Sequence, residues 1–581
     1  GIHAPANPRA SHVALSIELV NAYAAAVTET GGAVAGTEWD YQSESPLVDA
    51  RGWVLPRSAA HPSQLTDSDA ALEAVRLEET AEGADPAETT GAEAAPGRKP
   101  AGRELSGGDP SPADLAEGLR DHDDAEFHAP GSAHFKGDFY QHGEDQPQLL
   151  MNLVLPNGAR FYVDHAHPEY SAPETIGARR AVLYDVAGDR VAHRAAGRLA
   201  QEEGAPQLKL YKNNTDGKSV SYGAHENYLV PRSVSFDSLV AGLIPFFVTR
   251  QIICGAGRLG IGSRNQQAGY QISQRADFFE EQVGLETTLR RPIINTRDEP
   301  HADYNRYRRL HVIIGDANMS EYSAWLRVGT TALILELIES EGAPQLRLTD
   351  PVAALQAISH DPTLRTKVST NRGDLTALEI QRMYLRAAAA RAAEMSGPRG
   401  VSTAPDTETA EVLEAWERLL DDLSTDVSRA ADRLDWVAKL QLMESYRRRD
   451  GLGWDSPRLA MVDLQYADID PEKGLYYKLV RAGRMRRLFS DSQVEWATKH
   501  PPEETRAWLR GHLVSEYPSL VVGASWDQVL MRPDEVSAVI RLNMPEPTRG
   551  GRADAEPIIA GAASPHDLIT ALAKYLNEER R

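Results

Sequence analysis

The densest group of polar side chains in the sequence lies in one short run, Arg160-Phe161-Tyr162-Val163-Asp164-His165-Ala166-His167-Pro168-Glu169-Tyr170. If residues 161–164 form a strand, the alternation of side chains places Arg160, Tyr162 and Asp164 on one face, with His167 and Glu169 just beyond it. A guanidinium, a phenol and a carboxylate rarely share a buried face without partners. This run therefore indicates a functional site, and a solvated surface cluster is the alternative.

Two further polar clusters contain groups that bind phosphate or a hard cation. They are Lys212-Asn213-Asn214-Thr215-Asp216-Gly217-Lys218 with Ser221-Tyr222-Gly223-Ala224-His225-Glu226-Asn227-Tyr228, and Ser273-Gln274-Arg275-Ala276-Asp277 with residues 291–303, His311 and Gly315-Asp316-Ala317-Asn318. Oxygen and imidazole ligands suit magnesium bound to nucleotide phosphates, and arginines suit the phosphates themselves. A single histidine on a strand is more often a core residue than a ligand, so each cluster alone is a weak signal. The three together favour an enzyme that handles phosphate.

Other motifs that could carry chemistry are weaker. Residues 255–260 match the dinucleotide-binding pattern G-x-G-x-x-G, but no helical period follows, as that motif requires. The pair His165 and His167 could suggest zinc, but no further spaced histidine or cysteine completes a site. Cys254, the one cysteine, excludes an internal disulfide and is expected to be a small buried hydrophobe.

Composition limits the class of protein. The chain of 581 residues is 41% hydrophobic and 25% charged, as in ordinary globular proteins, and its net charge of −22 disfavours a nucleic-acid partner. No apolar stretch reaches the roughly 20 residues of a membrane helix, and the start does not resemble an export signal. We therefore expect a cytoplasmic protein with no membrane segment.

An acidic insertion interrupts the globular sequence. Residues 61–146 contain 20 acidic and 6 basic side chains, a net charge of −14, and few β-branched or aromatic residues. Such a segment buries too little apolar surface to offset its ordering entropy. We expect it to be disordered, either as a passive spacer or with a role near the site.

The elements that must position these residues follow from hydrophobic spacing. We expect strands at 152–164 (with a turn at 155–158), 207–211 and 310–315, and helices at 10–27, 317–340, 407–448 (as a pair) and 565–579. Strands and helices follow no βαβ rhythm, so the expected fold class is α+β with an antiparallel sheet. Pro501-Pro502 suggests a boundary between a catalytic domain at 1–500 and a small mixed domain at 501–581.

With these motifs in hand, the sequence resembles the depupylase family, which removes the small protein Pup from lysine conjugates and is the sister of the Pup ligases. The resemblance extends from about Val20 to Glu578. It rests on the runs 162–170, 210–216, 225–229, 291–303 and 307–318, which occur in the order of the family. It implies a glutamine synthetase-like fold, in which a curved antiparallel sheet is packed with helices and a small C-terminal domain follows.

The resemblance also implies roles for single residues. Asp164 is implied as the catalytic aspartate, acting as nucleophile or as base. Tyr162 and Glu169 are implied at the metal. The residues implied at the nucleotide are Arg160, His225, Arg275, Arg297, His311 and Trp436. Trp436 has an alternative interpretation as a core aromatic of an amphipathic helix. The implied cofactors are ATP and magnesium.

The implied function is hydrolysis of the isopeptide bond between Pup and lysine, and of the C-terminal glutamine amide of Pup. Pup and pupylated proteins are the implied partners, with a functional link to the bacterial proteasome. A Pup–protein ligase is one alternative. We favour the depupylase because of residues 278–289, the run 164–167 and the long insertion.

The family carries Glu-x-Glu-Tyr-Gly in its first strand, and its glutamates bind magnesium. This chain begins at Gly1-Ile2-His3, which corresponds to a point just past that motif, so we expect a truncated start. If the start is not truncated, a non-catalytic relative that binds Pup is the second alternative.

Overall fold

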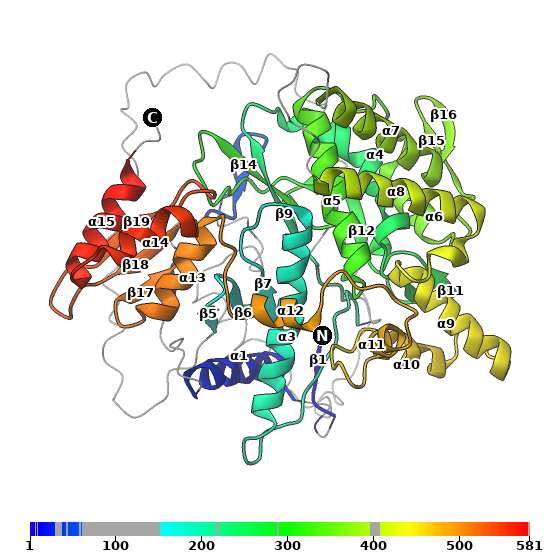
Figure 1. Ribbon diagram of the computed structural model, residues 1–581. Helices are drawn as coiled ribbons and strands as arrows, with labels where there is room; N and C mark the ends of the chain where they lie inside the picture. Colours follow the sequence, from blue (N-terminus) through cyan, green and yellow to red (C-terminus); the bar gives the residue numbers. More distant parts are fainter. Residues whose placement is uncertain are drawn as a thin grey trace, which may run out of the picture. The chain divides into compact units, whose positions relative to one another are not determined.

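The computed structural model describes residues 1–5, 7, 10–29, 38–41, 44–56, 60, 151–164, 166–216, 220–287, 290–395 and 407–578 (Figure 1). The acidic insertion at 61–146 lies outside these residues, so its expected disorder stays a prediction. The described helices are α1 (His12–Glu29), α3 (Ala178–Leu199), α4 (Phe236–Cys254), α5 (Glu321–Glu339), α6 (Pro351–Ser359), α7 (Ala377–Met395), α8 (Thr407–Thr425), α9 (Asp435–Asp450), α10 (Pro457–Tyr466), α11 (Leu475–Arg481), α12 (Asp491–Ala497), α13 (Arg506–Glu516), α14 (Arg552–Ala560) and α15 (Pro565–Asn577), with short 3-10 helices η4 (Ala276–Phe278) and η5 (Val427–Ala430).

The described strands are short and form several small sheets, most of them antiparallel. They are β1 (Ile2–His3), β2 (Glu38–Trp39), β3 (Val48–Asp49), β4 (Trp53–Val54), β5 (Asn152–Val154), β6 (Arg160–Asp164), β7 (His167–Ser171), β8 (Lys209–Leu210), β9 (Glu226–Pro231), β10 (Arg258–Ile261), β11 (Gln267–Gln271), β12 (Phe279–Gly284), β13 (Arg291–Asn295), β14 (Tyr307–Val312), β15 (Lys367–Thr370), β16 (Gly373–Thr376), β17 (Val521–Ala524), β18 (Gln528–Met531) and β19 (Ile540–Asn543). The pairs β12–β13 and β17–β2 are parallel. The expected α+β class with mainly antiparallel pairing is confirmed.

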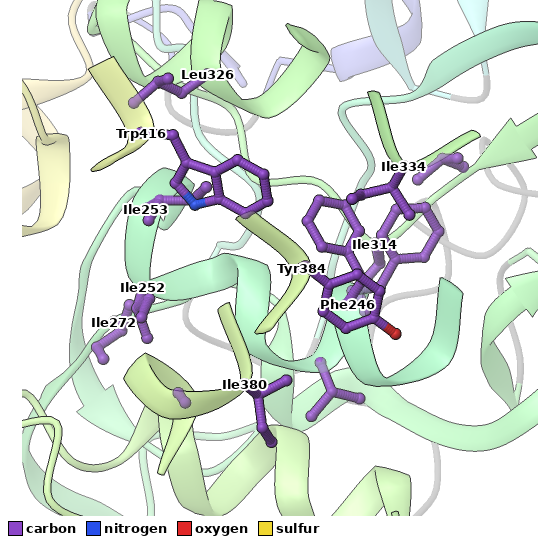
Figure 2. Packing of buried hydrophobic residues seen from close by; sticks show 14 of the residues in the cluster. Phe246, Ile252, Ile253, Ile272, Ile314, Leu326, Ile334, Ile380, Tyr384 and Trp416 are labelled. Carbon is purple, nitrogen blue, oxygen red and sulfur yellow. The ribbon is translucent and has the colours of Figure 1, made fainter. Parts of the chain in front are cut away.

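The main hydrophobic core surrounds α4 and α5. Its members include Phe246, Ile252 and Ile253 of α4, which pack with Tyr384 of α7 and Trp416 of α8 (Figure 2). Ser235 caps α4 by accepting a hydrogen bond from the Ser238 amide. By length and composition α4 could cross a membrane, which the search of the sequence for apolar stretches missed. However, 78% of its most apolar stretch is buried inside the protein. That degree of burial is typical of a core helix.

A second core lies beneath the sheet β5–β6–β7. Leu153 of β5 and Phe161 of β6 point into it and pack against Leu19 and Tyr23 of α1. Because side chains alternate along a strand, this packing turns Arg160, Tyr162 and Asp164 of β6 to the opposite face. The helix α1 therefore determines which side of the sheet is free for chemistry.

The helices α13, α14 and α15, which follow Pro502, contribute to a third hydrophobic cluster. The four-stranded sheet β19-β18-β17-β2 belongs to it, and its last strand, β2, comes from the N-terminal part of the chain. Glu174 lies just after β7. Its carboxylate accepts hydrogen bonds from Nε of Arg506 at 2.7 Å and from Nη2 of Arg510 at 2.5 Å, both on α13. This buried pairing ties the C-terminal part to the strands that carry the candidate site.

The predicted elements agree with the structure where the sequence signal was local. The helices expected at 10–27 and 565–579 are α1 and α15, and β5 and β6 flank the expected turn at 155–158. The helix expected at 317–340 begins later, at Glu321, because the Ala317 amide donates to Asn214 and the Ser320 amide donates to Asp435. The dinucleotide-like segment continues into strand β10 rather than a helix, and Cys254 is buried, both as expected.

Candidate active site

The polar face of β6 is the centre of the candidate site. Arg160 lies over the ring of Tyr162 at 4.0 Å, which confirms that alternate residues of this strand share a face. Asp164 ends the strand and is exposed. A carboxylate at an open strand end can reach a substrate that approaches the sheet.

β7 places a second carboxylate on the same face. The antiparallel register sets Glu169 directly opposite Tyr162 and His167 opposite Asp164. The Tyr162 hydroxyl donates to Oε1 of Glu169 at 2.5 Å. Burial and the charge of Glu169 raise the pKa of Tyr162 well above its usual value, so the phenol stays protonated. In this arrangement Tyr162 orients Glu169, and direct coordination of a metal by Tyr162 stays a prediction.

An aromatic box fixes Arg160. The guanidinium lies 4.0 Å from the Trp39 ring, and its Nε donates to Oδ1 of Asn152 at 2.8 Å. Glu44 forms an ion pair with it at 3.6 Å. Trp39 belongs to β2, so the C-terminal sheet contributes to holding this arginine.

A pair of imidazoles lies at the strand pair β9–β14. The rings of His225, just before β9, and His311, on β14, are 4.8 Å apart and nearly perpendicular. Nδ1 of His311 lies 2.9 Å from Oδ1 of Asn227, the residue opposite it in the register. Arg309 also donates to that amide oxygen, at 2.6 Å.

The imidazole pair lies close to the β6 face. The ring of His167 on β7 is 4.4 Å from that of Tyr222, three residues before His225. A side chain at Gly223 would crowd the His225 ring and come within 3.1 Å of Nη1 of Arg275. The glycine therefore allows His225 and Arg275 to approach each other.

Several arginines in the described part of the chain have a buried nitrogen without a hydrogen-bond partner, and two of them, Arg275 and Arg297, lie at the candidate site. Arg275 is buried, and its Nη1 donates to the carbonyl of Ile313, but its Nε has no hydrogen-bond partner among the described residues. Nε of the half-buried Arg297 is also unsatisfied within the described part of the chain. A buried donor without a partner is costly, so these two nitrogens fit an anionic ligand that accepts from them.

The electrostatics of the site favour an anion. Loss of hydration and the charge of Arg275 lower the pKa of His225 to about 4, although the residue is exposed at the surface, and Asp164 opposes this shift. Burial and Arg309 lower the pKa of His311 well below its usual value, and His301 behaves in the same way. Three neutral imidazoles among arginines indicate a positive potential.

The structure brings eight of the nine predicted site residues into this neighbourhood. The ninth, Trp436, is completely buried in the main core, where its Nε1 donates to the carbonyl of Ile252 at 3.0 Å. Trp436 therefore lies where its alternative interpretation, as a core aromatic of an amphipathic helix, places it. Within the described ranges, no three His, Cys, Asp or Glu side chains are grouped closely enough to hold a metal on their own.

Arg309, His301 and Asn227 lie in runs that the sequence analysis singles out, but no site role was predicted for them. Arg309 lies two positions before His311 on the same strand, so the period of two could have placed it on the site face. Asn227 faces His311 across the strand pair, and only the register reveals that relation. His301 lies in the run 291–303 and has a left-handed backbone conformation with φ of 47°, which the spacing of residues alone did not predict.

Comparisons with known proteins agree with this site. A family model described as "Pup-ligase protein" matches residues 1–530. A depupylase of Acidothermus cellulolyticus is 42% identical over 576 residues, which cover 98% of this chain and 97% of that protein. A Pup deamidase/depupylase of Mycobacterium tuberculosis is 41% identical over 578 residues, with the same coverage.

Pup ligases match a smaller part of the chain. A Pup–protein ligase of Pseudarthrobacter chlorophenolicus is 45% identical over 371 residues, which cover 62% of this chain and 80% of the ligase. The solved structure of the ligase PafA with ADP has a TM-score of 0.64 and 35% identity, and covers 85% of this chain and 99% of that one. The solved complex of Pup with PafA has a TM-score of 0.64 and 38% identity, over 74% of this chain and 85% of that one.

The depupylases thus match almost end to end, and the ligases match in part. On this ground the chain belongs to the Pup-ligase family, in its depupylase/Pup deamidase branch.

Proposed function

We propose that this protein is a depupylase and Pup deamidase that uses ATP and magnesium. It hydrolyses the isopeptide bond between Pup and a substrate lysine, and the amide of the C-terminal glutamine of Pup. The near-complete match to depupylases supports the reaction class. In this proposal Pup and pupylated proteins are the partners, in the cytoplasm, with a functional link to the bacterial proteasome.

The unsatisfied Nε atoms of Arg275 and Arg297 carry the assignment of a nucleotide phosphate site. A phosphate oxygen that accepts from each would remove the cost of leaving a buried donor unpaired. Loss of hydration lowers the pKa values of His225, His301 and His311, and nearby arginine charges add to this effect; these charges support the same conclusion, because they attract an anion. The related ligase PafA is solved in complex with ADP, which supports a nucleotide site in this fold.

Magnesium belongs beside the phosphates. Mg²⁺ is commonly held by one or two carboxylates together with phosphates and water, so it does not need a complete protein cage. Glu169 supplies a carboxylate that Tyr162 orients, and the neutral imidazoles of His225 and His311 border the same space. When bound, the metal would neutralise phosphate charge.

Two roles fit Asp164, and they differ in the first bond formed. As a nucleophile, its carboxylate attacks the amide carbonyl, and the C–N bond breaks. The lysine amine or ammonia leaves with a proton, and water then hydrolyses the acyl-aspartate to regenerate Asp164 and leave a Glu carboxylate on Pup. As a base, Asp164 takes a proton from water, which attacks the carbonyl directly. Trapping with hydroxylamine distinguishes them, since only the acyl-aspartate yields a hydroxamate on Asp164.

For the fold, we propose that β5–β6–β7 and β9–β14 are parts of the curved antiparallel sheet of a glutamine synthetase-like domain. The similarity to a Pup ligase structure over 85% of the chain supports this. The same similarity makes a Pup ligase the second candidate function.

One pair of assays tests the function. The full chain is incubated with ATP, magnesium and a pupylated protein, and release of free Pup is followed by gel and mass spectrometry. The matched assay contains Pup ending in glutamate, ATP and an unmodified acceptor protein. We expect release in the first and no conjugate in the second. Conjugate formation without release would overturn the proposal in favour of the ligase.

A further inference from the structure

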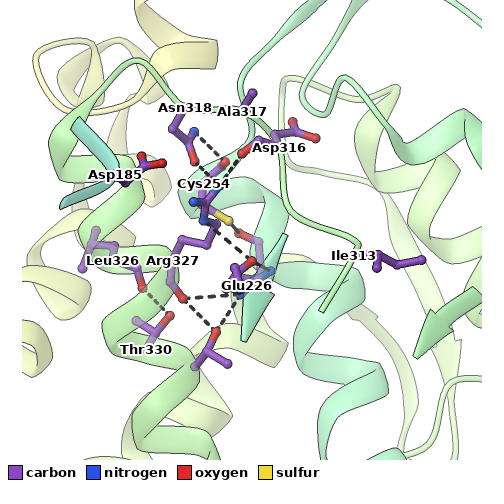
Figure 3. A network of polar contacts seen from close by, with 12 residues as sticks. Asp185, Glu226, Cys254, Ile313, Asp316, Ala317, Asn318, Leu326, Arg327 and Thr330 are labelled. Atoms are coloured by element: carbon purple, nitrogen blue, oxygen red, sulfur yellow. Dashed lines mark hydrogen bonds and ion pairs between the residues drawn. The ribbon is translucent and has the colours of Figure 1, made fainter. Parts of the chain in front are cut away.

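Asp316 follows β14 and is a buried carboxylate outside the set of site residues described above. Its side chain accepts three hydrogen bonds, from the Ala256 amide at 2.8 Å, the Gln274 amide at 2.9 Å and the Ser273 hydroxyl at 2.9 Å. The residue is 3% exposed. Figure 3 shows it in the buried polar network with Asn318, Arg327 and Cys254. Two of its three donors are the residues that directly precede Arg275.

Arg275 is tied to the same place through its backbone and its side chain. Its amide donates to the Ser273 hydroxyl at 3.0 Å, so Ser273 relays the carboxylate of Asp316 to the backbone of Arg275. Its Nη1 donates to the carbonyl of Ile313, three residues before Asp316. Its Nε is a buried donor without a hydrogen-bond partner in the described part of the chain.

A second residue bridges the same two segments. The Asn214 amide donates to Oε1 of Gln274 at 2.7 Å, and Oδ1 of Asn214 accepts from the Ala317 amide at 2.6 Å. Asn214 is completely buried. The neighbours of Arg275 and of Asp316 are thus joined twice, which leaves the arginine little freedom to move relative to β14.

The charge of Asp316 also affects Arg275. Burial and the nearby Arg291 lower the pKa of Arg275 to about 9, and Asp316 opposes that shift. The carboxylate therefore helps to keep a buried guanidinium protonated.

We propose that Asp316 is a positioning residue for nucleotide binding, acting through Ser273 and Gln274 to hold Arg275 with its Nε toward the phosphates. This inference rests on the proposed function, because it requires Arg275 to bind phosphate. Asp316 itself does not touch the nucleotide. Its effect is to fix the position of the Arg275 guanidinium. A displacement of about 1 Å would make that group far less effective at binding phosphate.

The test measures the dissociation constant for ADP with magnesium, by calorimetry on the full chain, together with the melting temperature. Ser273→Ala removes the relay and leaves the carboxylate in place, and we expect ADP affinity to fall about fivefold, as for one lost hydrogen bond. Asp316→Asn should weaken ADP about tenfold, since it also removes the compensating charge.

Glu321 supplies the matched control. Like Asp316 it is buried, and its carboxylate accepts from two backbone amides, those of Leu488 and Phe489, and from one side chain, Nε of Arg487. It has no contact with Arg275. We expect Glu321→Gln to lower the melting temperature while leaving ADP affinity within about twofold, because a lost structural bond alone does not move the site.

A double-mutant cycle with Arg275→Gln separates this inference from the proposed function. We expect Arg275→Gln to weaken ADP, and Ser273→Ala to add little once Arg275 is gone, because both act on one interaction. If Ser273→Ala and Asp316→Asn affect ADP no more than Glu321→Gln does, the positioning role is overturned and the phosphate site stands. If Arg275→Gln leaves ADP affinity unchanged, the role of Arg275 at the phosphates is overturned as well.

Discussion

The Tyr162 hydroxyl donates to Glu169 across the strand pair β6–β7, at 2.5 Å and directly opposite in the register. This bond fixes the direction in which the carboxylate of Glu169 points. A raised pKa keeps Tyr162 a donor at all physiological pH values. The two residues therefore act as a unit, in which the tyrosine determines how the glutamate faces the site.

Removal of the Glu169 carboxylate should weaken ADP binding at limiting magnesium. We expect Glu169→Gln to lose about tenfold in ADP affinity at low magnesium and less at saturating magnesium, since the loss is one of metal binding. Tyr162→Phe keeps the carboxylate and should have the smaller effect. Calorimetric titrations of ADP at several magnesium concentrations check both. Equal affinity of Glu169→Gln and wild type at limiting magnesium would contradict the role at the metal.

Asp164→Asn should abolish hydrolysis while leaving the fold and ADP binding intact. The side chain is nearly isosteric and exposed, so stability is little affected, but nucleophile and base are lost together. We expect turnover to fall by about 100-fold or more. Release of Pup from a conjugate measures this.

Asp374→Asn is the control for Asp164→Asn, since Asp374 is also an exposed strand aspartate, on the hairpin β15–β16. Its turnover should match wild type. Retention of more than about a tenth of wild-type turnover in Asp164→Asn would remove Asp164 from the chemistry.

His225 should remain neutral down to about pH 4, the pKa that loss of hydration and Arg275 give it. An unfolded histidine binds a proton below about pH 6.5. Since the unfolded chain then holds the additional proton, His225 makes the folded state less stable as pH falls from about 6.5 to 4. We expect His225→Gln to reduce the loss of melting temperature in that interval.

NMR titration of the His225 ring measures the pKa directly. A midpoint near 6.5 for His225 would contradict the lowered pKa.

Glu174→Gln should destabilise the protein by about 3–5 kcal/mol, because it leaves Arg506 and Arg510 buried without their charge partner. Although burial opposes it, the pairing with Arg510 and Arg506 lowers the pKa of Glu174 to about 2. The stabilisation is therefore present above pH 4.5, the ordinary value of the carboxyl, and is lost as pH falls from 4.5 to 2. Denaturant unfolding at pH 7 and at pH 3 checks both statements, and an equal effect of the substitution at the two pH values would contradict them.

The polar face of β6 could be predicted because it depends only on the alternation of side chains and on hydrophobic neighbours such as Phe161. The pairing of Tyr162 with Glu169 could not, because register depends on the turn, and residues 165–166 lack the Gly or Asn that marks a tight hairpin. Glu169 was expected just beyond the strand, and the structure places it on the next strand, β7.

Residues that depend on long-range packing were also beyond the sequence. Trp39 contacts Arg160 only because β2 joins a sheet whose other strands lie after residue 520. The late start of α5 depends on hydrogen bonds to Asn214 and Asp435, which are far away in the sequence. Trp436 was predictable as a core aromatic from its helical spacing, and that local signal describes its position.

The pairing of β2 with β17 has a consequence for how the enzyme is made. Gly523 and Ala524 align with Glu38 and Trp39, so the strand that carries Trp39 gains its partner only when residues near 524 have left the ribosome. Domains generally fold as units during synthesis, from the N-terminal end. A nascent chain that already contains Asp164 therefore still lacks the Trp39 contact that supports Arg160. Hydrolytic activity should arise only in a nearly finished polypeptide.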